Sequence, residues 1–117
     1  MFTITARKPS SPGEILKEEF MAPAGLTQEG LADAIHVERR WINEIVGDKR
    51  GITPDTAIRL GRYFGVSARF WMNLQARHNL WHVLAERRKE YERIKPHKAR
   101  LAYRPVMRKK LHGRGRS

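Results

Sequence analysis

The sequence of 117 residues contains no cysteine. A chain without thiols has no disulfide framework, no thiolate zinc or iron–sulfur site and no cysteine nucleophile. Long apolar runs are also missing, since the longest fall far short of the roughly 20 residues of a membrane span, and no apolar signal-peptide stretch begins the chain. The length fits one compact domain and disfavours a large catalytic fold. We therefore expect a soluble protein of the cytoplasm.

Acidic residues are absent from residues 95–117. This stretch contains nine basic residues, so it carries most of the formal net charge of +12. Too few of its residues are apolar and suitably spaced for burial, which predicts a mobile basic tail that favours polyanions such as nucleic acid. The same composition also fits a solvated, disordered end with no ligand.

The remaining chain shows helix start and stop signals at short intervals and little strand-like alternation. This pattern predicts an all-α domain over residues 11–94, after an N-terminal arm of residues 1–10 and before the tail. Ser11, Thr27, Thr53 and Ser67 are the expected N-caps of four of its helices. Five helices are expected, over residues 12–21, 28–35, 39–46, 54–64 and from 68 to an end between 87 and 96.

Apolar residues at helical spacing indicate which faces are buried. The inward face of the fourth helix is expected to comprise Ala57, Ile58, Leu60 and Phe64. The fifth helix has a wider apolar stripe: Phe70, Trp71, Leu74, Leu80, Trp81 and Leu84. We assign Phe70, Trp71, Leu74 and Trp81 to the core or to a dimer interface, because so wide a stripe needs a partner.

Residues 27–46 fit a helix-turn-helix, because two short helices flank a break of about three residues. In such a motif the second helix enters the DNA major groove. Arg39 and Arg40 lie in its first turn, where arginine can contact guanine, and Asn43 can contact adenine. Gln28 begins the first helix of the motif, where its side chain and the helix N-terminus can hold a phosphate.

Three further residues near this motif are candidates for DNA contact. A large aromatic such as Trp41 beside two arginines is unusual on an exposed helix unless it packs on the first helix, on thymine methyl groups or on sugar. Lys49 and Arg50, in the loop that follows, are natural phosphate ligands. The competing interpretation is that two arginines on a helix, or two cations in a loop, form an ordinary solvated surface.

Metal or catalytic chemistry has little support in the sequence. His78, His82 and Glu86 lie at positions i, i+4 and i+8 of the fifth helix and could hold a metal weakly. Three ligands from one helix cannot surround an ion, and several arginines lie nearby. The sequence therefore predicts no metal site, no cofactor, no catalytic residue and no enzymatic activity.

Several motifs together resemble one family, the HigA-type antitoxins, also called virulence-associated protein I, within the lambda-repressor-like helix-turn-helix class. The motifs are Pro12-Gly13-Glu14-Ile15-Leu16, Leu31-Ala32, Ile42, Ile45, Lys49-Arg50-Gly51-Ile52-Thr53, Ala57, Arg59-Leu60, Phe64-Gly65 and Phe70-Trp71-Met72-Asn73-Leu74-Gln75. The resemblance covers roughly residues 9–85. It implies a five-helix lambda-repressor-like fold and a homodimeric repressor of its own promoter. It also implies a palindromic operator and a RelE-like ribonuclease toxin as partner.

Carried over from the family, the DNA-contacting positions are Gln28, Arg39, Arg40, Trp41, Asn43, Lys49 and Arg50. The turn departs from the usual Gly-Val-Ser pattern. His36 stands where glycine relieves a left-handed backbone, and Glu38 stands where serine caps the helix. Glu38 can repel phosphate or accept a hydrogen bond from a cytosine amine, so we include it among the candidate DNA contacts.

Three alternatives remain open from the sequence. A solitary helix-turn-helix regulator would have no toxin partner. The charge favours this alternative, because RelE-like toxins are basic like this chain and would need a locally acidic or apolar docking surface. An RNA- or polyanion-binding protein would depend on the tail. A protein-interaction adaptor would show no salt-dependent affinity for DNA at all.

Overall fold

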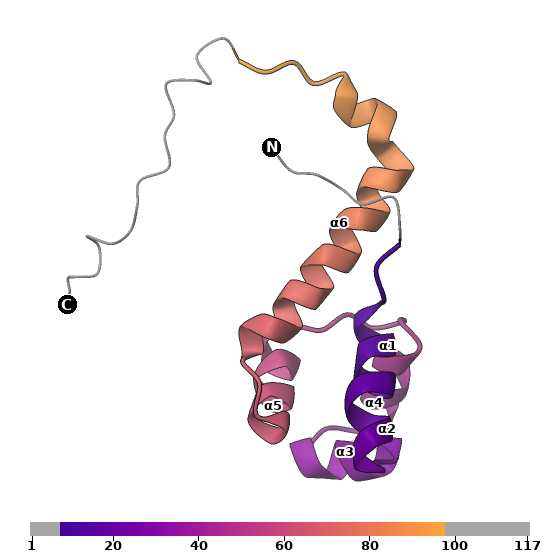
Figure 1. Cartoon of the computed structure of the whole chain (residues 1–117), viewed down its shortest axis with the longest axis vertical. Coiled ribbons are helices and arrows are strands. Elements are labelled where there is room, and N and C mark those ends of the chain that lie inside the picture. Colours follow the sequence, from indigo (N-terminus) through magenta and orange to yellow (C-terminus); the bar gives the residue numbers. More distant parts are fainter. Residues whose placement is uncertain (1–7, 98–117) are drawn as a thin grey trace, which may run out of the picture. The chain divides into compact units, whose positions relative to one another are not determined.

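A computed structural model describes residues 8–97, and all regular structure in that range is helical (Figure 1). With the continuous path from Pro12 to Ala24 counted as one helix, five helices are present there, as predicted. The elements are α1 (Pro12–Ile15), η1 (Leu16–Met21), α2 (Ala22–Ala24), α3 (Gln28–Ile35), α4 (Arg39–Val46), α5 (Pro54–Phe64) and α6 (Ala68–Glu92).

The first helical path is longer than the sequence predicts. It begins after Ser11, whose hydroxyl accepts a hydrogen bond of 3.0 Å from the Glu14 N–H. It then widens into the π-helical η1, in which the Ala22 N–H donates to the carbonyl of Lys17. This i→i−5 register allows the helix to continue through Pro23, which has no N–H and would clash with a carbonyl of a regular α-helix. The path ends at Gly25 in the left-handed region (φ 67°), not near residue 21.

The other helices begin and end close to the predicted residues. Thr27, Thr53 and Ser67 each accept a hydrogen bond from the backbone N–H three residues later, at the starts of α3, α5 and α6. Each such cap stabilises a helix by about 1 kcal/mol, because it satisfies one otherwise unpaired N–H. Gly65 ends α5 with φ 77°, as its position predicts.

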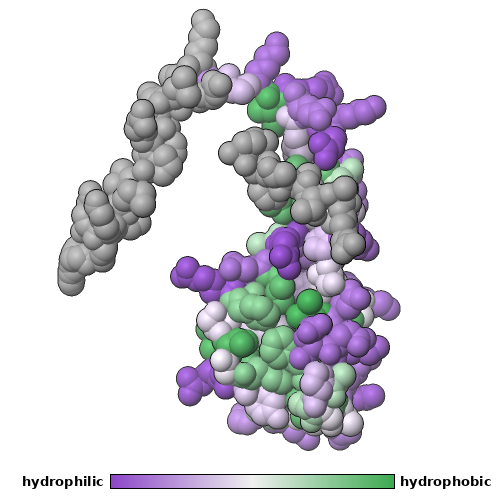
Figure 2. Space-filling model, in the orientation of Figure 1, coloured by the Kyte–Doolittle hydropathy of each residue, from purple (hydrophilic) through white to green (hydrophobic). Residues whose placement is uncertain are grey.

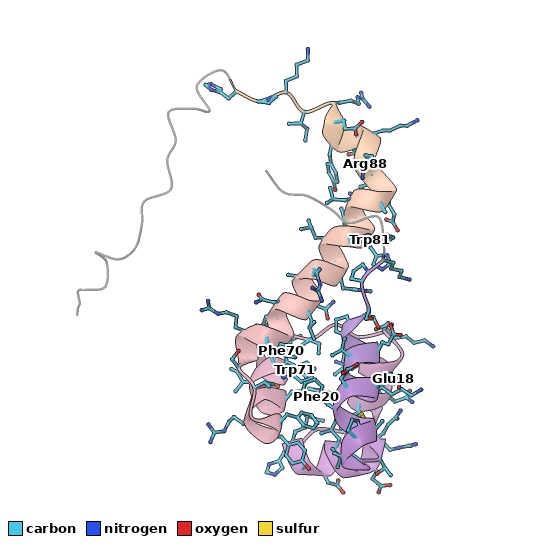
Figure 3. All side chains as sticks on the ribbon, viewed as in Figure 1. Glu18, Phe20, Phe70, Trp71, Trp81 and Arg88 are labelled. Carbon is cyan, nitrogen blue, oxygen red and sulfur yellow. The ribbon has the colours of Figure 1, made fainter. Side chains whose placement is uncertain are left out.

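The core lies where η1, α3, α4, α5 and the first turns of α6 meet. Its fully buried members are Leu16, Leu31, Ala32, Ile42, Ile45, Ala57, Leu60 and Trp71. Figure 3 shows Phe20, Phe70 and Trp71 converging, and the rings of Phe20 and Trp71 lie 4.8 Å apart between centroids. The expectation that Ile58 faces inward is wrong, because 54% of this residue is exposed. Ala57 and Leu60 fill the inner face of α5, and Ile58 lies on another side of that helix.

The apolar stripe of α6 divides into a buried part and an exposed part. Trp71 and Leu74 belong to the core, whereas Phe70, Leu80 and Val83 are 37%, 42% and 40% exposed. Trp81 lies further along α6 and is half-buried. Figure 2 shows apolar area framed by polar side chains on the helical bundle.

The chain divides into two compact units, Met1–Arg87 and Arg88–Ser117. The division coincides with a break in α6, since Arg87 has a non-helical backbone (φ −122°, ψ 24°). In the second unit, Arg88 and Glu92 lie one helical turn apart with 3.9 Å between Nη1 and Oε2. Most of the predicted basic tail, and all but three residues of the predicted N-terminal arm, lie outside residues 8–97.

Candidate nucleic-acid interface

The turn between α3 and α4 has the backbone that the sequence predicts. His36 ends α3 in the left-handed region (φ 62°, ψ 48°), which histidine tolerates better than bulky or β-branched residues do. Arg59 of α5 supports this turn, since its Nη1 donates to the carbonyls of Ile35 at 2.9 Å and His36 at 3.3 Å. An ion pair, 2.9 Å from Arg59 Nε to Asp55 Oδ2, holds the same guanidinium.

Glu38 is the N-cap residue of α4, but its side chain makes no capping hydrogen bond. The carboxylate of Glu38 instead accepts a bond from Arg40, with 3.3 Å between Nη2 and Oε1. Both side chains are 69% exposed, so the pair adds little to stability. The first turn of α4 therefore presents Arg39, Arg40 and a carboxylate together at the surface.

An amide pair joins the two helices of the motif. Asn43 Nδ2 donates to Gln28 Oε1 at 3.1 Å, across 15 residues of sequence. Gln28 is the first residue of α3 and Asn43 lies on the exposed face of α4. The structure thus brings the expected phosphate-binding residue into contact with an expected base-reading residue.

Trp41, Glu44 and Arg50 form a second cluster. Arg50 lies over the Trp41 ring, with 4.8 Å from its Cζ to the ring centroid. The same guanidinium binds Glu44 Oε1 through Nε at 2.8 Å and Nη2 at 2.7 Å. Arg50 is therefore engaged within the protein, and Trp41 packs on Arg50, a contact that the sequence interpretation did not anticipate.

The loop after α4 is also tied to that helix through its backbone. The N–H groups of Lys49 and Arg50 both donate to the carbonyl of Glu44, at 2.7 and 3.2 Å. At the other end of the loop, the Ile52 N–H donates to Gln75 Oε1 of α6 at 2.7 Å. The exposed side chain of Lys49 therefore extends from a backbone that is fixed by hydrogen bonds. Within residues 8–97, no ion pair involves Lys49 or Arg39.

The histidines of α6 pack on one another. The rings of His78 and His82 are 4.5 Å apart between centroids. Burial, helped by the neighbouring His82 and Lys8, lowers the pKa of His78 although Asp48 opposes the shift. Over residues 8–97 no group of three or more histidine or acidic side chains is arranged to hold a metal ion. Within the same range, no helix is long and apolar enough to cross a membrane.

Comparison with known proteins identifies the family. Residues 16–71 match the helix-turn-helix family model. The antitoxin HigA-1 of Vibrio cholerae is 35% identical over 92 residues, which cover 79% of this chain and 87% of that protein. The chain belongs to the HigA family of helix-turn-helix antitoxins. This finding confirms the resemblance drawn from the motifs, and a HigA antitoxin is a DNA-binding regulator rather than an enzyme.

Two further HigA relatives extend the comparison. Virulence-associated protein I of Dichelobacter nodosus is 55% identical over 69 residues, which cover 59% of this chain and 64% of that protein. Among solved structures, the Pseudomonas aeruginosa antitoxin HigA with the higBA promoter is 45% identical with a TM-score of 0.72. That match covers 75% of this chain and 97% of the Pseudomonas chain.

Three residues important to the geometry were not recognised from the sequence as parts of the interface. Arg59, Glu44 and Gln75 hold the turn, Arg50 and the following loop, respectively. Arg59 and Gln75 stand within the motifs that resemble the HigA family, which was the available signal. Their contacts join separate elements, so helical periodicity alone cannot show them.

Proposed function

We propose that this HigA-family protein is a sequence-specific DNA-binding antitoxin and autorepressor. In this function it binds a palindromic operator in its own promoter as a homodimer and neutralises a RelE-like ribonuclease toxin. The observation that carries the proposal is the exposed face of α4, where Arg39, Arg40 and Asn43 stand together and Gln28 braces Asn43. A cytoplasmic location is part of this proposal, because the proposed ligand is DNA.

The contacts divide into those that position the protein and those that read bases. Gln28, with the N–H groups at the start of α3, binds a phosphate, and Lys49 binds a second one. Arg39, Arg40 and Asn43 face the base edges of the major groove, where arginine suits guanine and asparagine suits adenine. Trp41, covered by Arg50 on one side, packs on sugar or on thymine methyl groups.

A homodimer matches both the DNA geometry and the surface of α6. One recognition helix gives too little contact for operator-level specificity, so two copies related by a two-fold axis read half-sites about 34 Å apart. The exposed Leu80 and Val83, with the half-buried Trp81 between them in sequence, supply apolar area for such an interface.

The toxin partner sets a condition on charge. The chain carries a net +12 and RelE-like toxins are themselves basic, so their contact needs a locally acidic or apolar surface. The proposed toxin is supported by membership of the HigA family. A solitary regulator with the same DNA-binding face is the alternative.

The experiment is selection of binding sites from random duplex DNA, followed by titration of the selected duplex and of a scrambled duplex. We expect a palindromic consensus bound by a dimer. R39A and R40A should lose the preference for the selected duplex over the scrambled one, whereas the exposed α5 variant R62A should retain it. No enriched sequence, or stronger binding to structured RNA, overturns the DNA-reading function. Expression beside a ribonuclease toxin encoded by the adjacent gene then distinguishes an antitoxin, which restores growth, from a solitary regulator.

A further inference from the structure

Within residues 8–97, Glu38 is the one residue preceding any of the five helices whose side chain does not cap the helix. Ser11, Thr27, Thr53 and Ser67 all accept a bond from a backbone N–H at their helix starts. Glu38 has the same extended backbone (φ −72°, ψ 145°) but makes no such bond. A serine there would stabilise α4 more through capping, so helix stability does not account for this glutamate.

Affinity for DNA does not account for Glu38 either. Its carboxylate stands beside Arg39 and Arg40 at the start of α4, on the surface proposed to approach a polyanion. A negative charge in that place weakens the sequence-independent attraction to phosphates. The carboxylate also gains little from its exposed pair with Arg40.

The geometry of the pair leaves both partners able to bind a base. Only Oε1 of Glu38 and Nη2 of Arg40 are used in their 3.3 Å contact. Oε2 of Glu38, and the Nε and Nη1 groups of Arg40, make no hydrogen bond with the part of the chain that the structure describes. Nη2 also has a second N–H, which together with Nε or with Nη1 forms a fork that can meet the O6 and N7 acceptors of guanine while the carboxylate accepts from the N4 amine of a cytosine.

We propose that Glu38 and Arg40 act as one specificity-determining unit, in which Arg40 contacts a guanine and Glu38 a cytosine amine of the operator. This inference rests on the proposed function and adds the role of the carboxylate. Glu38 lowers binding to random DNA through its charge and regains affinity only where a cytosine N4 amine is present.

The test uses the full chain and the duplex selected by the wild type. Each cytosine of a half-site is replaced in turn by an analogue that lacks the exocyclic amine. At one position the wild type should lose about tenfold in affinity, whereas E38A should lose nothing further there. E38A should also bind scrambled DNA more tightly than the wild type does.

Two control variants separate the carboxylate from capping and from net charge. E38S restores a capping hydroxyl without the carboxylate, so it should match E38A in base preference while α4 is at least as stable. E86Q removes the same charge from α6 and should leave every base preference unchanged. The inference is overturned if the wild type and E38A lose equal affinity at every analogue position. It is also overturned if E86Q loses the same base preference as E38A.

The outcome also separates this inference from the proposed function. If the wild type enriches no sequence, the DNA-reading function itself fails. If the wild type enriches a consensus and E38A enriches the same consensus with the same stringency, only the role of Glu38 fails.

Discussion

Asn43 Nδ2 donates a hydrogen bond to Gln28 Oε1 at 3.1 Å, joining the exposed face of α4 to the first residue of α3. If Gln28 binds a phosphate and Asn43 binds a base, as we propose, this bond sets the two contacts in register before DNA binds. Preorganisation of this kind lowers the cost of ordering side chains on binding. In the proposed complex, the pair would therefore link the phosphate contact that positions the protein to the contact that reads a base.

The first prediction follows from this bond. Q28A and N43A should each weaken binding to the selected duplex, and the double variant should lose less than the sum of the two losses. We expect a coupling energy of about 0.5 to 3 kcal/mol, because the two side chains are in direct contact. Titration of all four proteins on one duplex measures it. Strict additivity would show that the bond has no role in the complex.

The second prediction concerns the two arginines of α4. R39A and R40A should each weaken specific binding by about 1 to 3 kcal/mol and leave the fold intact, because each removes a base contact and no core side chain. Binding to selected and scrambled duplexes, with thermal unfolding as the check of the fold, measures both effects. Equal weakening on the two duplexes would argue for phosphate contacts instead.

The third prediction distinguishes Lys49 from Arg50. K49A should weaken binding to both duplexes and lower the salt slope by about one unit, with no loss of stability. R50A should in addition lower the free energy of unfolding, because Arg50 binds Glu44 and covers Trp41. Salt titrations and urea unfolding provide the two measurements. An unchanged salt slope in K49A removes Lys49 from the interface.

The fourth prediction is a pH dependence. Burial lowers the pKa of His78 from 6.5, so the unfolded chain binds a proton more readily than the folded protein does. The free energy of unfolding should therefore decrease as the pH falls through about 6.5, and the loss is complete below the folded pKa. H78N should reduce this slope between pH 8 and 5, whereas H36N, whose backbone also suits asparagine, should keep it. Identical slopes for wild type and H78N would contradict the assignment.

The fifth prediction compares two tryptophans of α6. W71A should cost about 3 to 5 kcal/mol of unfolding free energy, because a fully buried side chain is lost from the aromatic cluster. W81A should cost the isolated chain less, since Trp81 is half-buried, and should weaken the proposed dimer more than W71F does. Chemical unfolding and sedimentation velocity separate the two. A monomer at operator-binding concentrations would exclude the proposed dimer.

Local features of this chain were predictable from the sequence to a considerable depth. The Ser and Thr caps depend on residues within a few positions of one another. The left-handed His36 and the missing cap at Glu38 were expected from the Gly-Val-Ser turn of the family that the chain resembles. The family resemblance was confirmed by the relatives. The individual DNA contacts stay predictions, because no nucleic acid is part of the structure.

Features that join distant residues were not predictable in the same way. The outward direction of Ile58 depends on which side of α5 meets the bundle, and apolar spacing alone wrongly placed this residue on the inner face. The widened η1 is a local feature, but it depends on how the helix adjusts to Pro23, for which the residue pattern has no clear signal. The Glu44–Arg50–Trp41 cluster depends on the path of a loop.

Arg59 shows that the helix-turn-helix is not an independent module. Its guanidinium donates hydrogen bonds to two backbone carbonyls at the end of α3, and its Nε forms an ion pair with Asp55 of the same helix α5. The angle at which α4 leaves the turn is consequently maintained by an element that comes later in the chain and makes no proposed contact with DNA. A peptide of residues 27–46 would keep every candidate base-reading side chain and still lack this support. Transplanting the DNA preference of this protein to another scaffold would therefore require α5 to be moved with the motif.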